Sequence, residues 1–286
     1  MRLEDFDTGT TYSARVLSSQ RITPESSSEE VREIVLEVER EHFAYEPGQS
    51  IGVVVSGEHA QGHKHHFRLY SVADTSHSAN GERPQVTLCV KRCNYIDEYS
   101  GERYEGISSN FLCDRREGDT VTINGPFGIP FEVPEDKDTD LLLIGMGTGI
   151  APFRALIKHI YQDVGDYRGK VRLFYGARSG LELLYMNEEK DDFSQYSDQA
   201  TFEAFKALSP SPNWADPIAM DYAREERSEE ILSMLESPHT RIYVAGRADI
   251  LDTLDRVFSH MIGSSDQWAR RKAELKAGQR WVELVY

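Results

Sequence analysis

The chain has 286 residues, 39% of them hydrophobic, which is enough for about two domains with separate cores and argues against disorder. Its formal net charge is −16, with 13 basic and 21 acidic residues in the first 130 positions and 19 and 27 in the rest. An acidic surface of this kind repels nucleic-acid phosphates and anionic membranes, so we expect neither as a partner.

The beginning of the sequence and its cysteines both favour a cytoplasmic protein. The first ten residues, MRLEDFDTGT, lack the basic and apolar regions of a secretion signal, and no apolar stretch approaches the length of a membrane span. We therefore expect a cytoplasmic protein without membrane insertion. Cys89, Cys93 and Cys113 form neither an even disulfide set nor a CxxC pair. We expect free thiols and no metal or iron–sulfur centre.

Short alternating runs rich in β-branched residues fill the chain up to about residue 135. Gly, Pro, Asn or Asp bound each run, as expected for strands joined by turns. The pattern predicts an antiparallel β-barrel domain over residues 1–136. The predicted strands are REIVLEVE (32–39), QSIGVVV (49–55), FRLYSVA (67–73), QVTLCVKR (85–92) and DTVTING (119–125).

After an acidic loop, VPEDKDTD (133–140), strands alternate with amphipathic helices. LLLIG (141–145) is continuously apolar, and VRLFYGA (171–177) has the character of a second buried strand. The order predicts an α/β domain with a doubly wound parallel sheet over residues 137–286. The alternation continues through the helix APFRALIKHIYQ (151–162), FEAFKAL (202–208), SEEILSMLE (228–236), RIYVAG (241–246) and the helix near ILDTLDRVFSHMI (250–262).

A glycine-rich turn, GMGTGIAPF, joins the first strand of this half to its first helix. Gly145, Gly147 and Gly149 are spaced by single residues, which lets a ligand approach the backbone closely. The start of the helix offers unpaired N–H groups to an anion. The position after the first parallel strand favours a dinucleotide pyrophosphate, although the turn is neither GxGxxG nor a Walker loop. A tight strand–helix connection without a ligand is the alternative.

Five motifs carry a more specific signal. They are RLYS (68–71), CVKR (89–92) followed by Tyr95, GISSNFLCD (106–114), GTGIAPFR (147–154) and the ending RWVELVY (280–286). In this order they resemble the plant-type ferredoxin–NADP reductase family. The resemblance implies an FAD-binding barrel followed by a nicotinamide-nucleotide domain. It also implies hydride exchange between nicotinamide and flavin, and single-electron exchange with ferredoxin or flavodoxin.

By this resemblance the strand RLYS binds the flavin. Arg68 pairs with the FAD pyrophosphate, Tyr70 lies against the isoalloxazine ring, and Ser71 sits near flavin N5. The roles suit the side chains, because a guanidinium forks onto phosphate oxygens and a phenol stacks on a flat ring. Alternation along a strand places Arg68 and Tyr70 on one face and Leu69 and Ser71 on the other. An exposed strand with Leu69 in the core is the alternative.

The resemblance assigns further residues to the flavin. Tyr95 stacks on the adenine, and a short helix opening at Gly106 holds the diphosphate with its N–H groups and Ser109. Tyr286 covers the flavin face opposite Tyr70, and nicotinamide must take its place. The other residues expected at the cofactor are Leu69, Cys89, Val90, Lys91, Ile107 and Ser108.

The same resemblance places Thr148 and Gly246 beside the nicotinamide nucleotide. The further contacts expected there are Ala177, Arg178, Ser209 and Arg247. Ala245 stands where the family commonly has a cysteine. Alanine is smaller and has no sulfur to polarise the nicotinamide ring, so we expect hydride transfer to persist but in an altered environment.

The expected catalytic residues are Ser71, Tyr286 and Glu283. The family usually has a glutamate two residues before the tyrosine, whereas Glu283 stands three before it and Leu284 occupies the expected offset. The carboxylate role of Glu283 rests on this imperfect match.

The nucleotide preference is expected to differ from that of NADP-specific relatives, which grip the 2′-phosphate with a Ser-Arg pair and a Lys/Tyr element. Here Ser209-Pro210 is followed by Asp216 and Asp221. Proline offers no donor and carboxylates repel phosphate, so we expect NADH to be accepted at least as well as NADPH. Arg178 is the nearby cation that could bind the phosphate.

Two alternatives to a diffusible reductase stay open: an electron-transfer subunit of a larger complex, and an NAD(P)H-dependent flavin or quinone reductase. The histidines of EHAQGHKHHF (58–67) are interpreted as a loop beside the flavin strand, not as metal ligands. Docking of an acidic ferredoxin needs basic patches. The candidates are Lys64, Lys91, Arg92, Arg115 and Arg116.

Overall fold

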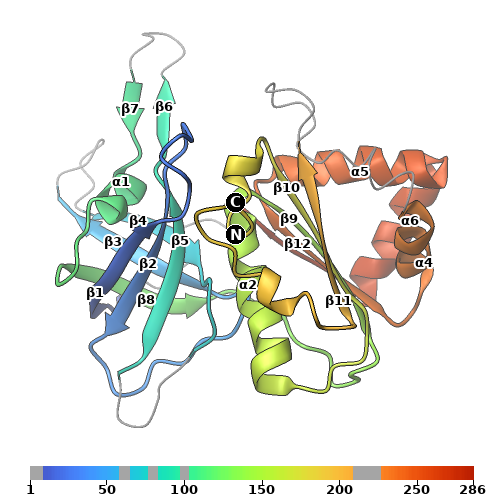
Figure 1. Ribbon diagram of the computed structural model, residues 1–286, viewed down its shortest axis with the longest axis horizontal. Helices are drawn as coiled ribbons and strands as arrows, with labels where there is room; N and C mark the ends of the chain where they lie inside the picture. The colour runs from blue at the N-terminus through green and yellow to red at the C-terminus, as the bar shows by residue number, and fades with distance from the viewer. Residues whose placement is uncertain (1–8, 58–64, 77–82, 97–102, 209–226) are drawn as a thin grey trace. The chain divides into compact units, whose positions relative to one another are not determined.

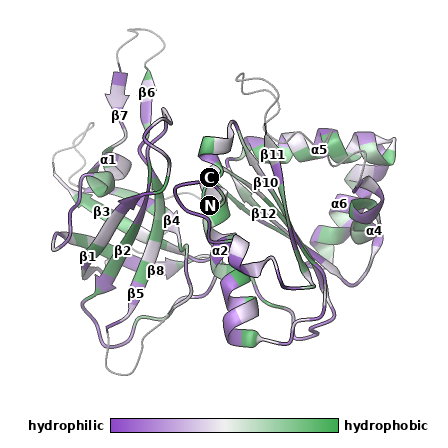
Figure 2. Cartoon of the chain, in the orientation of Figure 1, coloured by the Kyte–Doolittle hydropathy of each residue, from purple (hydrophilic) through white to green (hydrophobic). Residues whose placement is uncertain are grey.

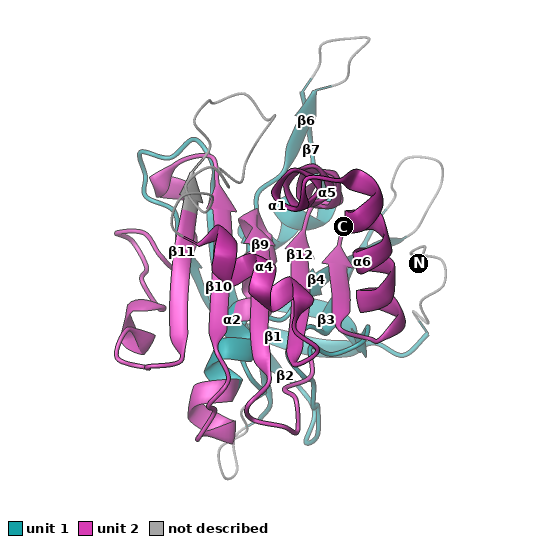
Figure 3. Cartoon of the chain, turned by 90° about the vertical axis from the view of Figure 1, so that its right-hand side faces the viewer, with its two compact units in different colours: residues 1–131, 154–159 teal, residues 132–153, 160–286 magenta. Residues whose placement is uncertain are grey.

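The computed structural model describes residues 9–57, 65–76, 83–96, 103–208 and 227–286. The chain forms two compact units (Figure 3). Unit 1 comprises residues 1–131 and 154–159, and unit 2 comprises residues 132–153 and 160–286. The division between them at residue 131 lies a few residues before the expected boundary at 136, and the segment 154–159 groups with unit 1.

Unit 1 is built on a six-stranded sheet with the order β4-β3-β8-β1-β2-β5, in which all neighbours are antiparallel. The two edge strands meet, because Val72 bridges Leu88 and the N–H of Ala73 donates to Thr87 O at 2.8 Å. The sheet therefore closes into the predicted barrel. Its strands are β1 (Tyr12–Arg21), β2 (Val31–Val38), β3 (Ser50–Ser56), β4 (His65–Ser71), β5 (Gln85–Lys91) and β8 (Thr120–Phe127).

Alternating side chains from these strands form the core of the barrel. Ile34, Leu36 and Val38 on β2 are fully buried together with Ala14 and Val16 on β1. β-Branched residues suit such a half-buried pleated surface. The strand β1 was not predicted, because its sequence YSARVLSSQR is mostly polar and buries only Ala14 and Val16.

Three short elements complete unit 1. β6 (Asn94–Ile96) and β7 (Arg103–Glu105) form a separate antiparallel ladder, and α1 (Ile107–Cys113) follows directly. The short helix expected to open at Gly106 is thus present, with Gly106 as its N-cap residue.

Unit 2 is built on a parallel sheet with the order β11-β10-β9-β12-β13 (Figure 1). The chain runs from β9 outward in one direction through β10 and β11, then returns to the other side of β9 for β12 and β13. Because crossovers between parallel strands are right-handed, this reversal places helices on both faces. The strands are β9 (Asp140–Met146), β10 (Val171–Ala177), β11 (Phe202–Leu208), β12 (Thr240–Gly246) and β13 (Trp281–Val285).

One face of this sheet packs against three helices: α4 (Ser228–Glu236), α5 (Asp249–Ile262) and α6 (Ser265–Ala277). Ile250, Leu254 and Phe258 are buried at a spacing of four residues along α5, which is the stripe of an amphipathic helix. Figure 2 shows this helix as alternating hydrophobic and hydrophilic bands. α6 and β13 were not predicted.

The remaining helix, α2 (Ile150–Lys158), follows the glycine-rich turn, and a wider π-type turn over His159–Val164 succeeds it. The regular α-helix therefore ends at Lys158, before the predicted end at residue 162. In the described part of the chain, no helix is long and apolar enough to cross a membrane.

Candidate functional site

The strand RLYS lies at the edge of the unit 1 sheet as β4, paired with β3. The guanidinium of Arg68 is exposed, and its Nη1 donates a weak bond of 3.3 Å to the carbonyl of the preceding Phe67. The hydroxyl of Ser71 lies 3.5 Å from that of Ser50. Because this bond is weak and local, most of the guanidinium donors of Arg68 are available to an anion.

Tyr70 is half-buried and packs against the barrel core, whereas Leu69 is only partly buried and lies outside that core. The alternative of a strand anchored by Leu69 is therefore not what the structure shows. Burial raises the pKa of the Tyr70 phenol above its ordinary value, and Arg68 and the Ser108 hydroxyl oppose that shift. The phenol stays neutral at physiological pH, as a stacking ring requires.

The start of α1 contains an unsatisfied hydroxyl. Ser108 is 2% exposed, and its Oγ has no partner with full hydrogen-bond geometry. The hydroxyl of Ser109 accepts from the N–H of Cys93 at 3.2 Å and donates to the Gly106 carbonyl at 3.3 Å. Of the two serines of α1, Ser109 is thus engaged in holding the chain, whereas the buried Ser108 hydroxyl lies beside the Tyr70 phenol without a hydrogen bond of full geometry.

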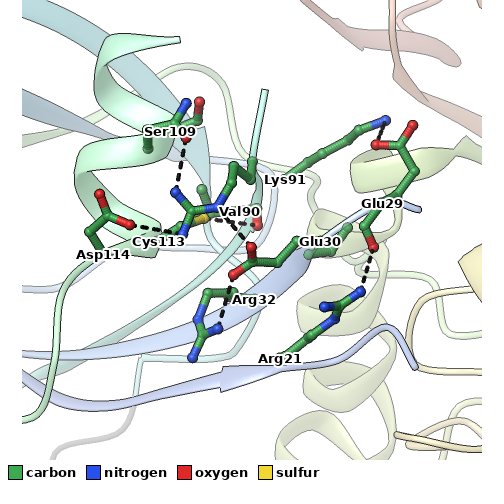
Figure 4. A network of polar contacts seen from close by, with 12 residues as sticks. Arg21, Glu29, Glu30, Arg32, Val90, Lys91, Ser109, Cys113 and Asp114 are labelled. Carbon is green, nitrogen blue, oxygen red and sulfur yellow. Dashed lines mark hydrogen bonds and ion pairs between the residues drawn. The ribbon is translucent and has the colours of Figure 1, made fainter. Parts of the chain in front are cut away.

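A network of charges fixes α1 to the barrel (Figure 4). Arg92 contacts Glu30 at 2.7 Å and Asp114 at 2.9 Å, and its Nη1 donates to Asn110 Oδ1 at 2.9 Å. Because Asn110 lies in the middle of the helix and Asp114 is its C-cap, the arginine holds the middle and the C-terminal end of α1. Its charge is neutralised within unit 1, which argues against the expected role in docking ferredoxin.

The other expected docking residues differ from one another. Lys91 pairs with Glu29 at 2.9 Å, so its charge too is neutralised locally. Arg115 lies over the Phe111 ring at 4.4 Å, while Arg116 is exposed. Lys64 lies outside the described residues.

Four further predicted contacts differ in burial. The side chains of Cys89 and Val90 are buried in the barrel wall, so any contact with a cofactor is through the backbone of the edge strand β5. Ile107 and Tyr95 are exposed. Tyr95 stacks on Tyr104, a residue that the sequence analysis missed, with ring centroids 5.3 Å apart.

These residues of unit 1 fit a flavin dinucleotide. Arg68 supplies a cation for the diphosphate, Ser108 supplies a buried hydroxyl without a hydrogen bond of full geometry, and Tyr95 supplies an exposed aromatic ring. Tyr70 adds a neutral aromatic side chain at the edge of the barrel.

In unit 2 the glycine-rich turn lies where the strand order reverses, between β9 and β12. Dinucleotides bind at this point of doubly wound sheets. A Cβ on Gly149 would lie 2.3 Å from the carbonyl oxygen of Ala245 and 2.7 Å from the nitrogen of Gly246, so only glycine lets the turn pack onto β12. Gly147 has φ +56°, a conformation that favours glycine.

Tyr286 is held at the same place. Its N–H donates to Gly246 O at 3.1 Å, and its carbonyl accepts from the N–H of Ala248 at 3.1 Å. Its hydroxyl is hydrogen-bonded to the Thr148 hydroxyl in the glycine-rich turn. The structure thus brings together the predicted residues Thr148, Gly246 and Tyr286.

Tyr175 on β10 supports this turn and was missed. Its buried hydroxyl donates to Gly147 O at 2.9 Å and accepts from the N–H of Leu184 at 3.3 Å. The signal in the sequence was a single tyrosine inside the otherwise buried strand VRLFYGA, since a buried phenol needs a hydrogen-bond partner.

Glu283 is held by two neighbouring side chains of unit 2. Its Oε1 lies 2.8 Å from Lys276 Nζ and accepts from Trp281 Nε1 at 2.6 Å. Side chains alternate along β13, so Glu283 shares the Trp281 face and Leu284 occupies the opposite one. The arrangement gives Glu283 a structural role within unit 2, and its catalytic role stays a prediction.

The remaining predicted nucleotide contacts are distributed along unit 2. Ala177 is buried at the end of β10, and the following Arg178 lies 4.0 Å from Glu182. Arg247 is exposed and lies 3.3 Å from Asp249. Ser209 lies outside the described residues, as do Pro210, Asp216 and Asp221.

The three cysteines are free thiols, with Cys93 exposed and the other two buried. Within the described ranges, no three His, Cys, Asp or Glu side chains are grouped to hold a metal ion. Of the histidine tract, His59 and His63 lie outside those ranges.

Comparison with known proteins agrees with this geometry. The family model described as "Oxidoreductase NAD-binding domain" matches residues 143–255. The chloroplast leaf isozyme 1 ferredoxin–NADP reductase of Oryza sativa subsp. japonica is 32% identical over 283 residues, which cover 96% of this chain and 76% of the relative. The chloroplast enzyme of Spinacia oleracea is 30% identical over 285 residues, covering 98% and 77%. The chain belongs to the ferredoxin–NADP reductase family.

A solved ferredoxin–NADP⁺ reductase from Plasmodium falciparum has the same fold, with a TM-score of 0.73, 21% sequence identity and coverage of 99% of this chain and 98% of that one. The predicted family and the predicted combination of barrel and parallel α/β sheet are confirmed. The ferredoxin–NADP reductase roles of individual residues stay predictions.

Proposed function

We infer that the protein is an FAD-dependent oxidoreductase that exchanges hydride with NAD(P)H and single electrons with ferredoxin. The observation that carries this is similarity to ferredoxin–NADP reductases over 96% and 98% of this chain, together with a flavin strand and a nucleotide turn that both fit their ligands. When bound, the flavin accepts electrons as a hydride and releases them singly. Flavodoxin is the second partner that we propose.

Different side chains of unit 1 bind different parts of FAD. Arg68 binds the diphosphate, Tyr70 presents a neutral ring to the flavin, and the buried hydroxyl of Ser108 gains a well-formed hydrogen bond from the cofactor. A buried hydroxyl with incomplete hydrogen bonding is unfavourable, so satisfying it adds to the affinity for FAD.

The nucleotide is bound at the turn Gly147–Gly149, where backbone can approach a pyrophosphate. Tyr175 holds the Gly147 carbonyl, and Thr148 contacts the nicotinamide nucleotide once Tyr286 gives way. These residues orient the coenzyme, and Gly246 leaves room beside them because it has no side chain.

We propose that NADH is accepted at least as well as NADPH. The support is the sequence Ser209-Pro210 with Asp216 and Asp221, together with the position of Arg178 beside Glu182 at 4.0 Å, which partly neutralises the cation a 2′-phosphate needs. The measurement is kcat/KM for both coenzymes. A preference for NADPH above about a hundredfold, roughly 2.7 kcal/mol, contradicts this proposal.

The function itself is tested on purified protein by its absorbance spectrum, by anaerobic titration with each coenzyme, and by ferredoxin-dependent reduction of cytochrome c. We expect a yellow protein whose flavin is bleached by NADH or NADPH. A protein that stays colourless after soaking with flavins contradicts the inference. Turnover with ferricyanide or quinones but none with ferredoxin or flavodoxin indicates a flavin or quinone reductase instead.

We also propose a cytoplasmic location, which the three free thiols support. Fractionation of cells expressing the tagged chain from its own promoter tests this. Recovery in the membrane fraction after a salt wash contradicts it.

A further inference from the structure

The ladder formed by β6 and β7 carries an aromatic pair on one face. Tyr95 and Tyr104 are directly opposite one another in the antiparallel register. Their ring centroids are 5.3 Å apart and their planes differ by 18°. Because side chains alternate along a strand, the adjacent Ile96 lies on the other face. One face of the ladder is therefore a stacked pair of tyrosines.

The two rings present a large aromatic surface to solvent. Tyr95 is 59% exposed and Tyr104 is 42% exposed. A ladder of three residues per strand has little stability of its own in water, and a cross-strand aromatic pair is one of the contacts that stabilises it. The ring of Tyr104 thereby restricts the orientation of the Tyr95 ring.

The base of the ladder is bonded to the segment expected to hold the cofactor diphosphate. The N–H of Gly106 donates to Cys93 O at 2.9 Å, and the N–H of Cys93 donates to Ser109 Oγ at 3.2 Å. Tyr95 and Tyr104 each stand two residues further along their strands, or about 7 Å. A ligand with an anionic group at one end and a flat ring at the other, such as the ADP half of FAD, matches this arrangement.

The separation of the rings decides where a flat base stacks. A base inserted between them needs about 7 Å, twice the stacking distance of about 3.4 Å. The observed 5.3 Å is too small, so the base binds on an outer face of the pair.

We propose that Tyr104 is a positioning residue for FAD: it stacks on Tyr95, fixes the ring on which the adenine binds, and so makes the protein select FAD over FMN, which lacks the adenosine. This deepens the proposed flavoenzyme function and rests on it.

The test is flavin binding to flavin-free protein, followed by fluorescence titration with FAD and with FMN. We expect Tyr104→Ala to weaken FAD binding by about three- to tenfold, as for loss of one stacked ring, with FMN binding unchanged. Tyr104→Phe keeps the ring and keeps the affinity. Ile96→Ala removes a side chain that is 68% exposed from the opposite face and serves as the matched control, with both affinities unchanged.

Two results overturn the proposal. Unchanged FAD affinity in Tyr104→Ala shows that the ring plays no part in binding, and an equal loss of FAD and FMN affinity shows that Tyr104 only supports the fold of unit 1. If the unmodified protein binds neither flavin, the proposed function fails, and this inference falls with it. That outcome is distinct, because it appears before any substitution is made.

Discussion

The hydroxyl of Tyr286 is hydrogen-bonded to the hydroxyl of Thr148 in the glycine-rich turn. The same turn is the proposed binding place of the nicotinamide nucleotide, so tyrosine and coenzyme compete for it. Tyr286→Phe keeps the ring but removes a hydrogen bond whose net contribution is about 1 kcal/mol. We expect the KM for NADH to fall by about two- to fivefold.

The control for this prediction is Tyr161→Phe. It removes another hydroxyl pair of unit 2, since Tyr161 OH lies 2.9 Å from Thr201 Oγ1, away from the turn. The KM of this variant should stay at the wild-type value. A KM that rises in Tyr286→Phe, or falls equally in both variants, shows that the Thr148 contact does not restrain coenzyme binding.

The parts of the site that sequence predicted are those that local pattern determines. Strand alternation and turn residues predicted the strand of Arg68 and Tyr70, and the glycine spacing predicted a turn at Gly147 and Gly149. Each signal lies within a few consecutive residues, so no knowledge of distant neighbours is needed.

The parts that were missed depend on pairing between distant segments. The bond from Tyr175 to Gly147 O needs the register of β10 against β9, and the stack of Tyr104 on Tyr95 needs the register of β7 against β6. Glu283 illustrates the same limit, because its distance in sequence from Tyr286 did not reveal that it faces Lys276.

The glycines of the nucleotide turn should differ in their tolerance of a methyl group. In Gly149→Ala the added Cβ would lie 2.3 Å from Ala245 O, and overpacking against backbone is expected to destabilise the protein by about 3 kcal/mol. Gly147 meets nothing within 4 Å and has φ +56°, so alanine there costs about 1 to 2 kcal/mol through backbone strain.

Urea unfolding of the two variants measures this difference, with Gly180→Ala as the control. A Cβ added at Gly180 would also have no atom within 4 Å, and the φ of Gly180 lies outside the left-handed region. Alanine there should therefore be neutral or slightly stabilising. Equal midpoints for Gly149→Ala and Gly147→Ala contradict the close approach of the turn to β12.

Asp74 should make the stability of unit 1 depend on pH. Its carboxylate lies 2.6 Å from Lys158 Nζ and 3.2 Å from Arg154 Nη1. Burial alone raises its pKa, but Arg154 and Lys158 outweigh burial and hold the pKa below its usual value. The stabilisation is therefore complete above the unfolded pKa of about 3.9 and is lost as pH falls through the folded pKa.

Asp74→Asn should reduce the free energy of unfolding by about 2 kcal/mol at pH 7, because Lys158 loses its carboxylate partner and Arg154 keeps the more distant Glu33 at 3.7 Å, and by less at pH 3. Urea unfolding at both pH values measures this. Asp138→Asn is the control, because Asp138 pairs with Arg168 at 2.7 Å on the exposed surface and its loss should leave the midpoint unchanged. A destabilisation by Asp74→Asn that is equal at both pH values contradicts the prediction.

Glu283→Gln separates the structural role of this residue from a catalytic one. Glutamine still accepts from Trp281 Nε1 but loses the ion pair with Lys276, which is partly exposed and contributes about 0 to 1 kcal/mol. The rate of flavin reduction by NADH, measured by stopped flow, should stay within about twofold of wild type. Ser71→Ala, at the proposed hydride-transfer position, should lower that rate by at least about tenfold. A comparable loss in Glu283→Gln, with unchanged stability, would support a catalytic role for the glutamate despite its position beside Lys276.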